Sequence, residues 1–290
     1  MHKREVTAVR LIALVFACAA ALIIAAMLYL MAPSRRRKSR MGVFEQYFIA
    51  HRGFHQNGTE RPENSMPAFS AAVSRGYGIE LDVQLTADGV PVVFHDFTLH
   101  RAAGDARRIS ELTFAELEEI PLFGSSQRIP RFSEVLRMVD GRVPMIIELK
   151  AMWKHRELCE KAARILDRYR GSYCIESFSP LALYWFRRHR PEVMRGQLAT
   201  SLFREGKRRW WFFAWTLTWC LSNRLCRPDF VAYNFEFRNI LPVRLMRRMY
   251  RCEMAAWTIR SQADLEKSRS HFDVFIFDSF DPKARSEQAG

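Results

Sequence analysis

The sequence predicts an α/β fold, a TIM-type (β/α)8 barrel preceded by one N-terminal transmembrane helix. Short apolar β-type runs alternate with helical patterns over residues 45–290, which is the arrangement of a parallel barrel. A long uncharged run stands near the N-terminus. Histidines and carboxylates gather at the ends of the β runs, where barrels of this class carry their functional side chains.

The positive charge is unevenly distributed, and its distribution narrows the choice of partner. The formal charge is +14 overall, with +7 over residues 1–40, −4 over 41–150 and +11 over 151–290. The acidic third contains the carboxylates that a bound cation would need. The basic ranges, 1–40 and 151–290, belong to a chain with an apolar run that could cross a membrane. We therefore expect it to meet anionic lipid headgroups, and we expect no nucleic acid partner.

The six cysteines show no CxxC pair and no zinc-site spacing. One of them lies in the apolar N-terminal run, and the other five are scattered through the remaining chain. Scattered cysteines in a domain of this size are typical of reduced thiols and not of a disulfide framework. This pattern favours a cytoplasmic domain.

The N-terminal run predicts a single membrane span over residues 11–32. Its 22 residues carry no charge, and at about 1.5 Å per residue they can cross a hydrocarbon core of roughly 30 Å. A cleavable signal peptide is the alternative, but its apolar region is normally about 7–15 residues and ends in an A-x-A-like site. We therefore expect a retained anchor with a flank at 1–10, a basic linker at 33–44 and a barrel domain at 45–290.

The basic flanks of this span predict its orientation. Lys3, Arg4 and Arg10 precede the span, and five Lys or Arg residues follow it within 33–40. The positive-inside rule keeps the more basic flank in the cytoplasm. We therefore expect a single-pass protein of the cell membrane with a cytoplasmic C-terminal domain.

Nine β-type runs follow, one more than a barrel needs, so one of them is expected to be peripheral. The predicted strands are Phe48–Ala50, Ile79–Val83, Pro91–Phe94, Met145–Leu149, Tyr173–Phe178, Met194–Leu198, Phe230–Tyr233, Ala255–Ile259 and Val274–Phe277. The predicted helices are a segment capped by Asn64 or Ser65 that ends at Gly76, and residues 131–140, 155–170, 180–189, 241–251 and 262–269.

The barrel is expected to be irregular near its second and third runs. Only eight residues separate Val83 from Val92, and they include the turn signal Asp88-Gly89. A helical crossover between parallel strands needs about ten or more residues. Either the two runs form a hairpin, or an extended loop replaces the helix.

Residues 210–221 form an aromatic run, with four tryptophans and two phenylalanines directly after a basic stretch. Twelve residues are too few to cross a membrane. A buried barrel helix would explain this run, and so would a segment lying among lipid headgroups beside basic residues. We favour membrane contact through this run, in addition to the span.

Three carboxylates form a candidate metal site: Glu80, Asp82 and Glu148. Glu80 and Asp82 are two residues apart, so they point to the same side of a strand, and Glu148 ends another apolar run. Ligation by oxygen alone suits a hard divalent cation, Mg2+ or Ca2+. Such a cation would stabilise negative charge that grows on a reacting phosphate.

Two histidines, His51 and His95, each stand at the end of a short apolar run. Imidazole exchanges protons near neutral pH, so one ring can accept a proton from an attacking hydroxyl while the other donates to a leaving alcohol. Arg52, which follows His51, and Lys150, which lies two residues after Glu148, could hold the phosphate. The whole set predicts metal-assisted phosphoryl transfer.

Several motifs together resemble the glycerophosphodiester phosphodiesterase family, closely from residue 48 to 150 and more weakly as far as the last strand. They are AHRG at 50–53, PENSMPAF at 62–69, ELDVQLTADGVPVVFHD at 80–96, Leu99 and Arg101, IPRFSEVL at 129–136, IELK at 147–150, ESFSP at 176–180 and AWTIR at 256–260. The resemblance implies a metal-dependent TIM-type barrel that hydrolyses glycerophosphodiesters to glycerol 3-phosphate and an alcohol.

The resemblance also implies a role for each matched residue. It assigns His51 and His95 as the acid/base pair and the three carboxylates as the metal ligands. It implies phosphate or substrate contacts for Arg52, Lys150 and Trp257, and a supporting role for Glu63 of the PEN motif. In the mechanism it implies, the neighbouring glycerol hydroxyl attacks phosphorus, and water then opens the cyclic phosphate.

Departures from the family pattern concern the alcohol pocket. The last strand reads FIFDSFDP where the family commonly has a Thr-Asp-x-Pro ending, and Arg260 stands where Asn is frequent. The identity of the leaving alcohol therefore stays open.

Two other functions fit parts of the sequence. The anchor and the aromatic run favour a lysophospholipase D-type hydrolysis of membrane lysophospholipids as an alternative reaction. A non-catalytic barrel that binds lipid headgroups is the third hypothesis. The complete set of histidines and carboxylates argues against it, because a decayed site is expected to lose at least one of these groups.

Overall fold

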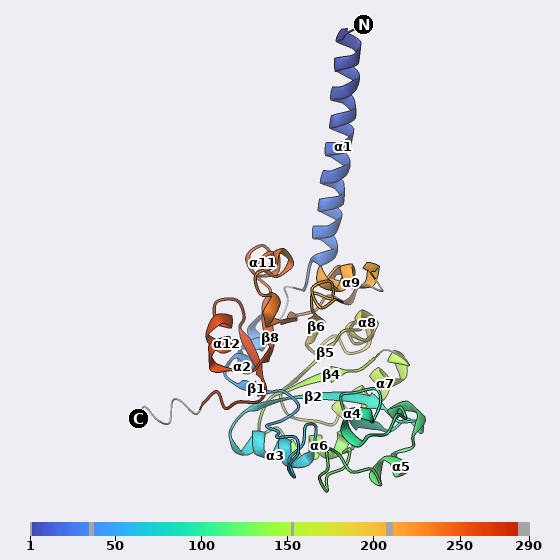
Figure 1. Cartoon of the computed structure of the whole chain (residues 1–290), viewed down its shortest axis with the longest axis vertical. Coiled ribbons are helices and arrows are strands. Elements are labelled where there is room, and N and C mark those ends of the chain that lie inside the picture. Colours follow the sequence, from blue (N-terminus) through green and yellow to red (C-terminus); the bar gives the residue numbers. More distant parts are fainter. Residues whose placement is uncertain (1, 35–37, 152–153, 207–210, 284–290) are drawn as a thin grey trace.

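A computed structural model describes residues 2–34, 38–151, 154–206 and 211–283, and it shows a closed barrel of eight parallel strands (Figure 1). The strands are β1 (Phe48–Ala50), β2 (Gly78–Leu85), β4 (Met145–Leu149), β5 (Tyr173–Ser177), β6 (Arg195–Ala199), β7 (Phe230–Asn234), β8 (Glu253–Ile259) and β9 (Val274–Phe277). Each strand pairs in parallel with the next, and β1 closes the ring by pairing with both β2 and β9. The predicted fold class is confirmed.

The ninth β run, β3 (Pro91–Val93), lies outside the ring. It pairs antiparallel with the end of β2, with Val83 opposite Val93. Gly89 adopts a φ of 75° in the connecting turn, a conformation that glycine reaches without steric cost. The expected irregularity is therefore a hairpin, the first of the two alternatives, and β3 is the peripheral run.

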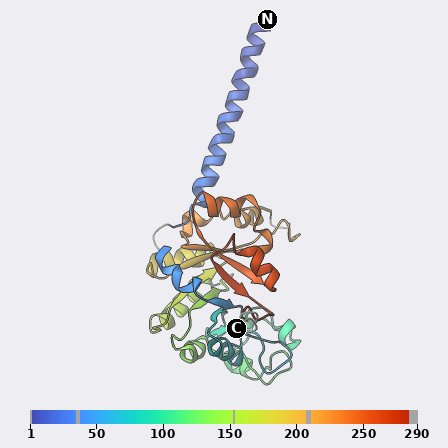
Figure 2. The same ribbon diagram turned by 90° about the vertical axis from the view of Figure 1, so that its left-hand side faces the viewer.

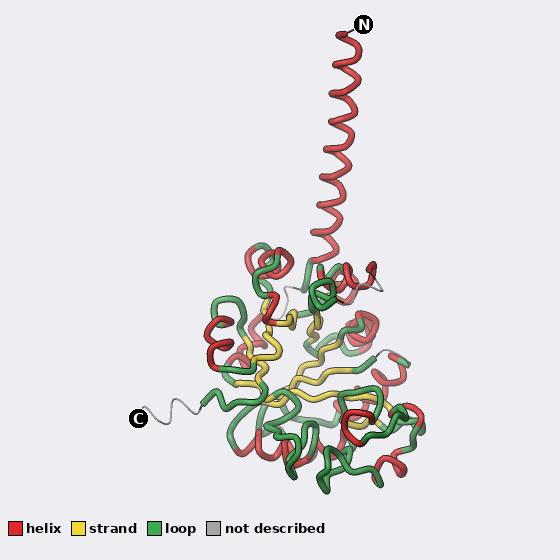
Figure 3. Tube along the Cα trace, viewed as in Figure 1, coloured by secondary structure: helices red, strands yellow, loops and turns green. Residues whose placement is uncertain are grey.

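Helices surround the ring of strands (Figure 3). Six of them match the predicted segments: α3 (Met66–Ser74), α6 (Phe132–Val139), α7 (His155–Leu166), α8 (Pro180–His189), α11 (Leu241–Arg248) and α12 (Gln262–Ser268). Ser65 is the residue that caps α3, because its hydroxyl accepts from the Ala68 N–H. The shorter elements α4 (His100–Ala103), α5 (Phe114–Glu118), α10 (Asn223–Cys226) and the 3-10 turns at Ile109–Glu111 and Phe235–Phe237 were not predicted.

Strand alternation divides the core into two layers. Outward residues such as Leu81 and Ile147 pack with the surrounding helices, whereas inward residues such as Ile146 and Leu198 fill the barrel interior. A third apolar cluster lies in the excursion after β3, where Phe94, among others, is buried. The HD motif, His95 and Asp96, lies at the start of this excursion and reaches the mouth of the barrel.

A short helix closes the barrel at the end opposite the mouth. This helix, α2 (Lys38–Glu45), lies directly before β1. Its Met41 and Phe44 are both 1% exposed and belong to the interior cluster. Most of the range expected as a basic linker, 33–44, is therefore a helix that packs with the barrel; residues 35–37 of that range lie outside the described part.

The helix α1 (His2–Met31) projects away from the barrel (Figures 1 and 2). Its segment Val9–Met31 has a mean hydropathy of 2.9 and is long and apolar enough to cross a membrane. Its last turn docks on the barrel: the Asn223 side-chain amide donates to the Met31 carbonyl at 2.9 Å, and Met31 is fully buried.

The aromatic run is a helix with two different faces. This helix, α9 (Trp211–Thr218), buries Ala214 and Leu217 against the barrel, as a core helix would. Trp211, Phe212 and Phe213 are nevertheless 50–67% exposed. Trp210 lies outside the described residues. Figures 1 and 2 show α9 and α11 at the end of the barrel domain where α1 attaches.

The burial of α2 leads to a stability prediction. We expect Phe44→Ala to lower the free energy of unfolding of the barrel by about 3–5 kcal/mol, because it removes a fully buried ring and leaves a cavity. Val43→Ala on the same helix is the matched control, since Val43 is 40% exposed and should change stability by less than about 0.5 kcal/mol. Denaturant unfolding of the detergent-solubilised full chain measures both; equal small effects would mean that α2 is dispensable.

Candidate active site

Three buried carboxylates meet at the carboxyl ends of β2 and β4. The strand register places Asp82 opposite Glu148, and Glu80 lies one pleat earlier on the same face of β2. One oxygen from each of Glu80, Asp82 and Glu148 lies within 4.8 Å of the other two. Glu80 and Asp82 thus share one face of β2, as their spacing predicts, and Glu148 lies beside them.

A fourth carboxylate extends this cluster. Glu176 on β5 is in register with Glu148, is 1% exposed, and leaves its Oε2 atom buried with no hydrogen-bond partner among the described residues. Burial, together with the charges of Glu148 and Asp82, raises the pKa of Glu176 well above its usual value. Four carboxyl groups are thus concentrated on one side of the barrel mouth.

Lysine and arginine compensate part of this charge. The Lys150 ammonium lies 2.9 Å from Asp82 Oδ1 and 2.8 Å from Glu148 Oε2. Burial opposes ionisation of Asp82, but Lys150 and other cationic neighbours, Arg52 included, hold its pKa well below the usual range. Burial and then Asp82 raise the pKa of Glu80. Burial also raises the pKa of Glu148, although Lys150 opposes this. The cluster therefore holds more carboxylate than its cations neutralise.

The donor set fits a hard divalent cation. It consists of carboxylate oxygens only, it is buried, and the raised pKa values of two members, Glu80 and Glu148, reflect a repulsion that a cation would relieve. Glu80, Asp82 and Glu148 are the side chains that would hold such an ion.

His51 follows β1 and lies beside the last strand. Its backbone N–H donates to the Phe277 carbonyl at 2.9 Å, so its ring comes next to Asp278, with 3.6 Å between His51 Nδ1 and Asp278 Oδ2. The other nitrogen, Nε2, lies 3.9 Å from Glu80 Oε2. Burial and the neighbouring Arg52 charge lower the pKa of His51 to about 4, and Asp278 opposes this shift. The imidazole is therefore neutral at pH 7.

His95 reaches the site from the excursion after β3. The Gln84 side-chain amide holds this segment by donating to the carbonyls of Phe94 and Asp96, at 2.7 and 2.9 Å. The His95 Nδ1 atom lies 2.5 Å from Asp96 Oδ1. Burial opposes ionisation of Asp96, but His95 and Arg101 lower its pKa, so it accepts from Nδ1–H. The other ring nitrogen of His95, Nε2, has no hydrogen-bond partner among the described residues.

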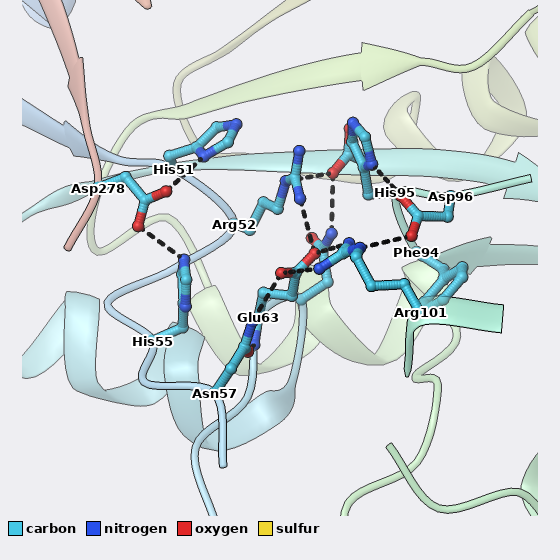
Figure 4. Close-up of polar contacts among 12 residues, drawn as sticks. His51, Arg52, His55, Asn57, Glu63, Phe94, His95, Asp96, Arg101 and Asp278 are labelled. Atoms are coloured by element: carbon cyan, nitrogen blue, oxygen red, sulfur yellow. Dashed lines mark hydrogen bonds and ion pairs between the residues drawn. The ribbon is translucent and has the colours of Figure 1, made fainter. Parts of the chain in front are cut away.

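Glu63 joins the two histidine segments. Its carboxylate accepts from Arg52 at 2.7 Å and from both terminal nitrogens of Arg101 at 2.7 and 2.8 Å, and the Asn57 amide adds a contact at 2.9 Å (Figure 4). Burial opposes ionisation, yet Arg101 and Arg52 lower the pKa of Glu63 to about 2. In the view of Figure 4, Arg52 lies between the two imidazoles.

The backbone after His51 allows this arrangement. Arg52 has a φ of 56°, and its N–H donates to Glu80 Oε2 at 3.0 Å. Gly53 follows with a φ of 82°, and an added Cβ there would lie 2.8 Å from the backbone carbon of Ala68. The HRG motif thus needs glycine at this position for both conformation and close approach.

Trp257 lies on β8 and packs edge-on against Phe178, with 5.8 Å between ring centroids. Its indole N–H is buried and has no hydrogen-bond partner among the described residues. This N–H is compatible with the expected substrate contact. Among the described residues, no side-chain hydrogen bond joins Trp257 to the charged groups of the site.

Sequence reasoning missed several members of this network: Asp278, His55, Asp96, Arg101 and Glu176. The structure places His55 Nε2 3.1 Å from Asp278 Oδ1, so Asp278 bridges two imidazoles. Asp278 and Glu176 could have been found, because both lie at or near the carboxyl ends of predicted strands. Arg101 belongs to a matched motif but received no role from it, and His55 carries no such signal, since it lies in a loop whose direction only the tertiary fold sets.

Comparison with known proteins identifies the family of this chain. The model of the glycerophosphoryl diester phosphodiesterase family matches residues 51–281. A glycerophosphodiester phosphodiesterase of Caldanaerobacter subterraneus is 32% identical over 161 residues, which is 52% of this chain and 65% of that protein. A lysophospholipase D of Mus musculus is 32% identical over 154 residues, 49% of this chain and 45% of that protein. The alignments thus span less than two thirds of the length of either relative.

The fold agrees with a solved structure as well. A phosphodiesterase of Oleispira antarctica, solved in complex with its product sn-glycerol-3-phosphate, superposes with a TM-score of 0.68 and 21% identity. The superposition covers 84% of this chain and 97% of that one. Because the family model extends from the first site histidine to the loop after the last barrel strand, the chain belongs to the glycerophosphoryl diester phosphodiesterase family.

Proposed function

We propose that the protein is a metal-dependent phosphodiesterase that hydrolyses glycerophosphodiesters to glycerol 3-phosphate and an alcohol. One observation carries the proposal: a buried carboxylate trio lies at the barrel mouth beside two imidazoles, each adjacent to its own carboxylate. Family membership and the product named for the Oleispira antarctica relative support the same reaction.

The proposed proton transfers follow from the surroundings of each ring. Neutral His51 accepts the proton of the glycerol hydroxyl next to the phosphate as that oxygen bonds to phosphorus. His95, oriented by Asp96, donates a proton to the alcohol oxygen as its bond to phosphorus breaks. The two rings then exchange roles while water opens the cyclic phosphate.

Cationic groups hold the phosphate in this proposal. Arg52 and Lys150 lie against the carboxylates and can contact phosphate oxygens, and the free indole N–H of Trp257 offers another donor. A divalent ion, Mg2+ or Ca2+, on Glu80, Asp82 and Glu148 would supply electrostatic stabilisation of the negative charge at phosphorus. Glu63 would hold Arg52 in position.

The same proposal places the protein in the cell membrane. The exposed apolar helix Val9–Met31 supports an anchor, and the basic residues within 33–40 support a cytoplasmic barrel domain. The free cysteines are compatible with that compartment, since all six are unpaired.

A second substrate class is favoured by α9. The helix α9, which carries the exposed Trp211, Phe212 and Phe213, lies at the end of the barrel domain where α1 attaches (Figure 1). Aromatic side chains at this level suit the membrane interface and would bring the barrel mouth to lipid substrates. We therefore retain hydrolysis of membrane lysophospholipids as the alternative, and a lysophospholipase D is among the relatives.

We expect His51→Ala to reduce glycerol 3-phosphate release from glycerophosphocholine by about 10²–10⁴-fold, because the proton acceptor is lost. The assay is run with EDTA and then with Mg2+ or Ca2+ restored. His100→Ala, which changes an exposed histidine on α4, is the control and should keep full activity. Normal turnover by a correctly folded His51→Ala variant would refute the assignment.

Metal binding can be tested without turnover. We expect Glu80→Gln to raise the unfolding temperature of the metal-free protein by a few degrees, about 2–5 °C, because it relieves carboxylate repulsion. The same change should abolish the stabilisation that Mg2+ or Ca2+ gives the parent protein. Glu119→Gln, an exposed carboxylate, should change neither value. An undiminished metal-induced rise in Glu80→Gln would contradict the proposed ligand set.

The lysophospholipid alternative predicts a difference between substrates. Replacing Trp211, Phe212 and Phe213 together by Ser should reduce activity on lysophospholipid in vesicles at least about tenfold. Each aromatic ring that enters the membrane interface contributes about 1–3 kcal/mol to membrane binding, and the variant loses this contribution. Activity on soluble glycerophosphocholine should stay within about twofold and serves as the internal control, since these rings are exposed. Equal losses on both substrates would argue against a role in lipid access.

A further inference from the structure

The segment of α11 and its flanks is strongly basic. From Phe237 to Cys252 the sequence contains five arginines and no carboxylate. Val243 and Met246 are buried and hold α11 on the barrel, whereas Arg244, Arg248 and Arg251 are exposed. No ion pair involves these three side chains in the part of the chain that the structure describes.

These arginines surround a hollow. A cavity of about 730 Å³ is lined by Arg238, Arg244, Arg247, Arg248, Arg251 and His271. Two acids, Asp273 and Glu253, also line it, and the Asp273 carboxylate accepts from Arg247 at 2.7 Å, so the arginines outnumber the acids. The cavity therefore presents several guanidinium groups to solvent, and guanidinium binds phosphate oxygens in a bidentate manner.

The hollow lies at the end of the apolar helix. The Tyr250 hydroxyl, directly after α11, donates to the Leu28 carbonyl, which belongs to the segment Val9–Met31. A neighbouring cavity of about 520 Å³ shares Arg251 with the first and extends to Ser34, three residues past the helix. If Val9–Met31 crosses the bilayer, these contacts hold the arginines at the depth of the lipid headgroups.

Apolar side chains accompany the arginines. Leu241 and Met249, on either side of Arg244 and Arg248, are 50% and 47% exposed. A surface that alternates exposed apolar side chains with arginine suits the boundary between headgroups and acyl chains. It does not suit a soluble anion, which would gain nothing from the apolar contacts.

We propose that the α11 face, defined by Arg238, Arg244, Arg247, Arg248 and Arg251 with Leu241 and Met249, binds the phosphate-bearing headgroups of anionic phospholipids. This site is separate from the carboxylate cluster at the barrel mouth, and it fixes the rotation of the barrel about the membrane span. The inference rests on the proposed anchor, because the anchor places α11 at headgroup depth.

Quenching of a probe on α11 by labelled lipids tests the proposal. The full chain with Cys18→Ser and Met249→Cys is labelled with a fluorophore and inserted into phosphatidylcholine nanodiscs. Cys18 and Met249 are exposed, whereas the other five cysteines are buried. Phosphatidylglycerol and phosphatidylcholine that carry the same spin label near the glycerol are added at equal, low mole fraction. We expect the phosphatidylglycerol label to quench at least about threefold more, since basic residues near the membrane surface attract anionic lipids.

Two triple variants separate this site from general positive charge. Arg244→Gln, Arg248→Gln and Arg251→Gln together should reduce the quenching ratio to about one, because the headgroup contacts are lost. Arg137→Gln, Arg164→Gln and Arg168→Gln remove an equal charge from a second exposed arginine cluster on α6, α7 and the turn after α7, and this variant should keep the ratio of the parent. Both variants should retain activity on soluble glycerophosphocholine, which verifies folding.

The possible failures can be told apart. If alkaline carbonate extracts the parent chain from membranes, the anchor proposal fails, and the α11 site fails with it. If the chain stays inserted but the quenching ratio is one, only the α11 site is wrong. Equal loss in both triple variants would indicate diffuse attraction instead of a site. Reversal of the quenching by millimolar inorganic phosphate would indicate a soluble-anion site and would also overturn the proposal.

Discussion

Repulsion among buried carboxylates at the barrel mouth is the constraint on which the site depends. Glu80, Asp82, Glu148 and Glu176 project inward from three adjacent strands, and the parallel register brings them together. Burial alone would force such groups to take up protons. Lys150 and the Arg52 segment compensate part of the charge, and the proposed cation would neutralise the remainder. The energetic cost of the cluster is therefore tied to its proposed use.

A second layer of ion pairs orients the groups that would move protons. Asp278 lies beside His51, Asp96 beside His95, and Glu63 joins their neighbours Arg52 and Arg101. The excursion after β3 packs around an apolar cluster of its own, separate from the barrel core. Its position over the barrel therefore depends on these ion pairs and on the hydrogen bonds from Gln84. Loss of Glu63 would thus affect both halves of the site.

The part of the barrel domain where α1 attaches has a different design. The last turn of α1 packs on α10 and on the end of α11, so the apolar helix and the barrel share a buried boundary. The helices α9 and α11, which carry exposed aromatic side chains and arginines, lie near this attachment (Figure 1). In this arrangement, the residues proposed to contact lipid differ from the residues of the barrel mouth, so a substitution in one set leaves the other set intact.

The sequence by itself determined the barrel class, the six main helices and the carboxylate trio. Periodicity identifies strands and helices, and a spacing of two places Glu80 and Asp82 on one face without knowledge of the fold. Only the tertiary structure decided that β3 forms a hairpin, that α2 fills the barrel end and that Asp278 meets His51. Such contacts join segments that are far apart in the sequence. The pairing of β1 with β9 closes the ring and brings the His51 and Asp278 segments together, and no local sequence pattern encodes this pairing.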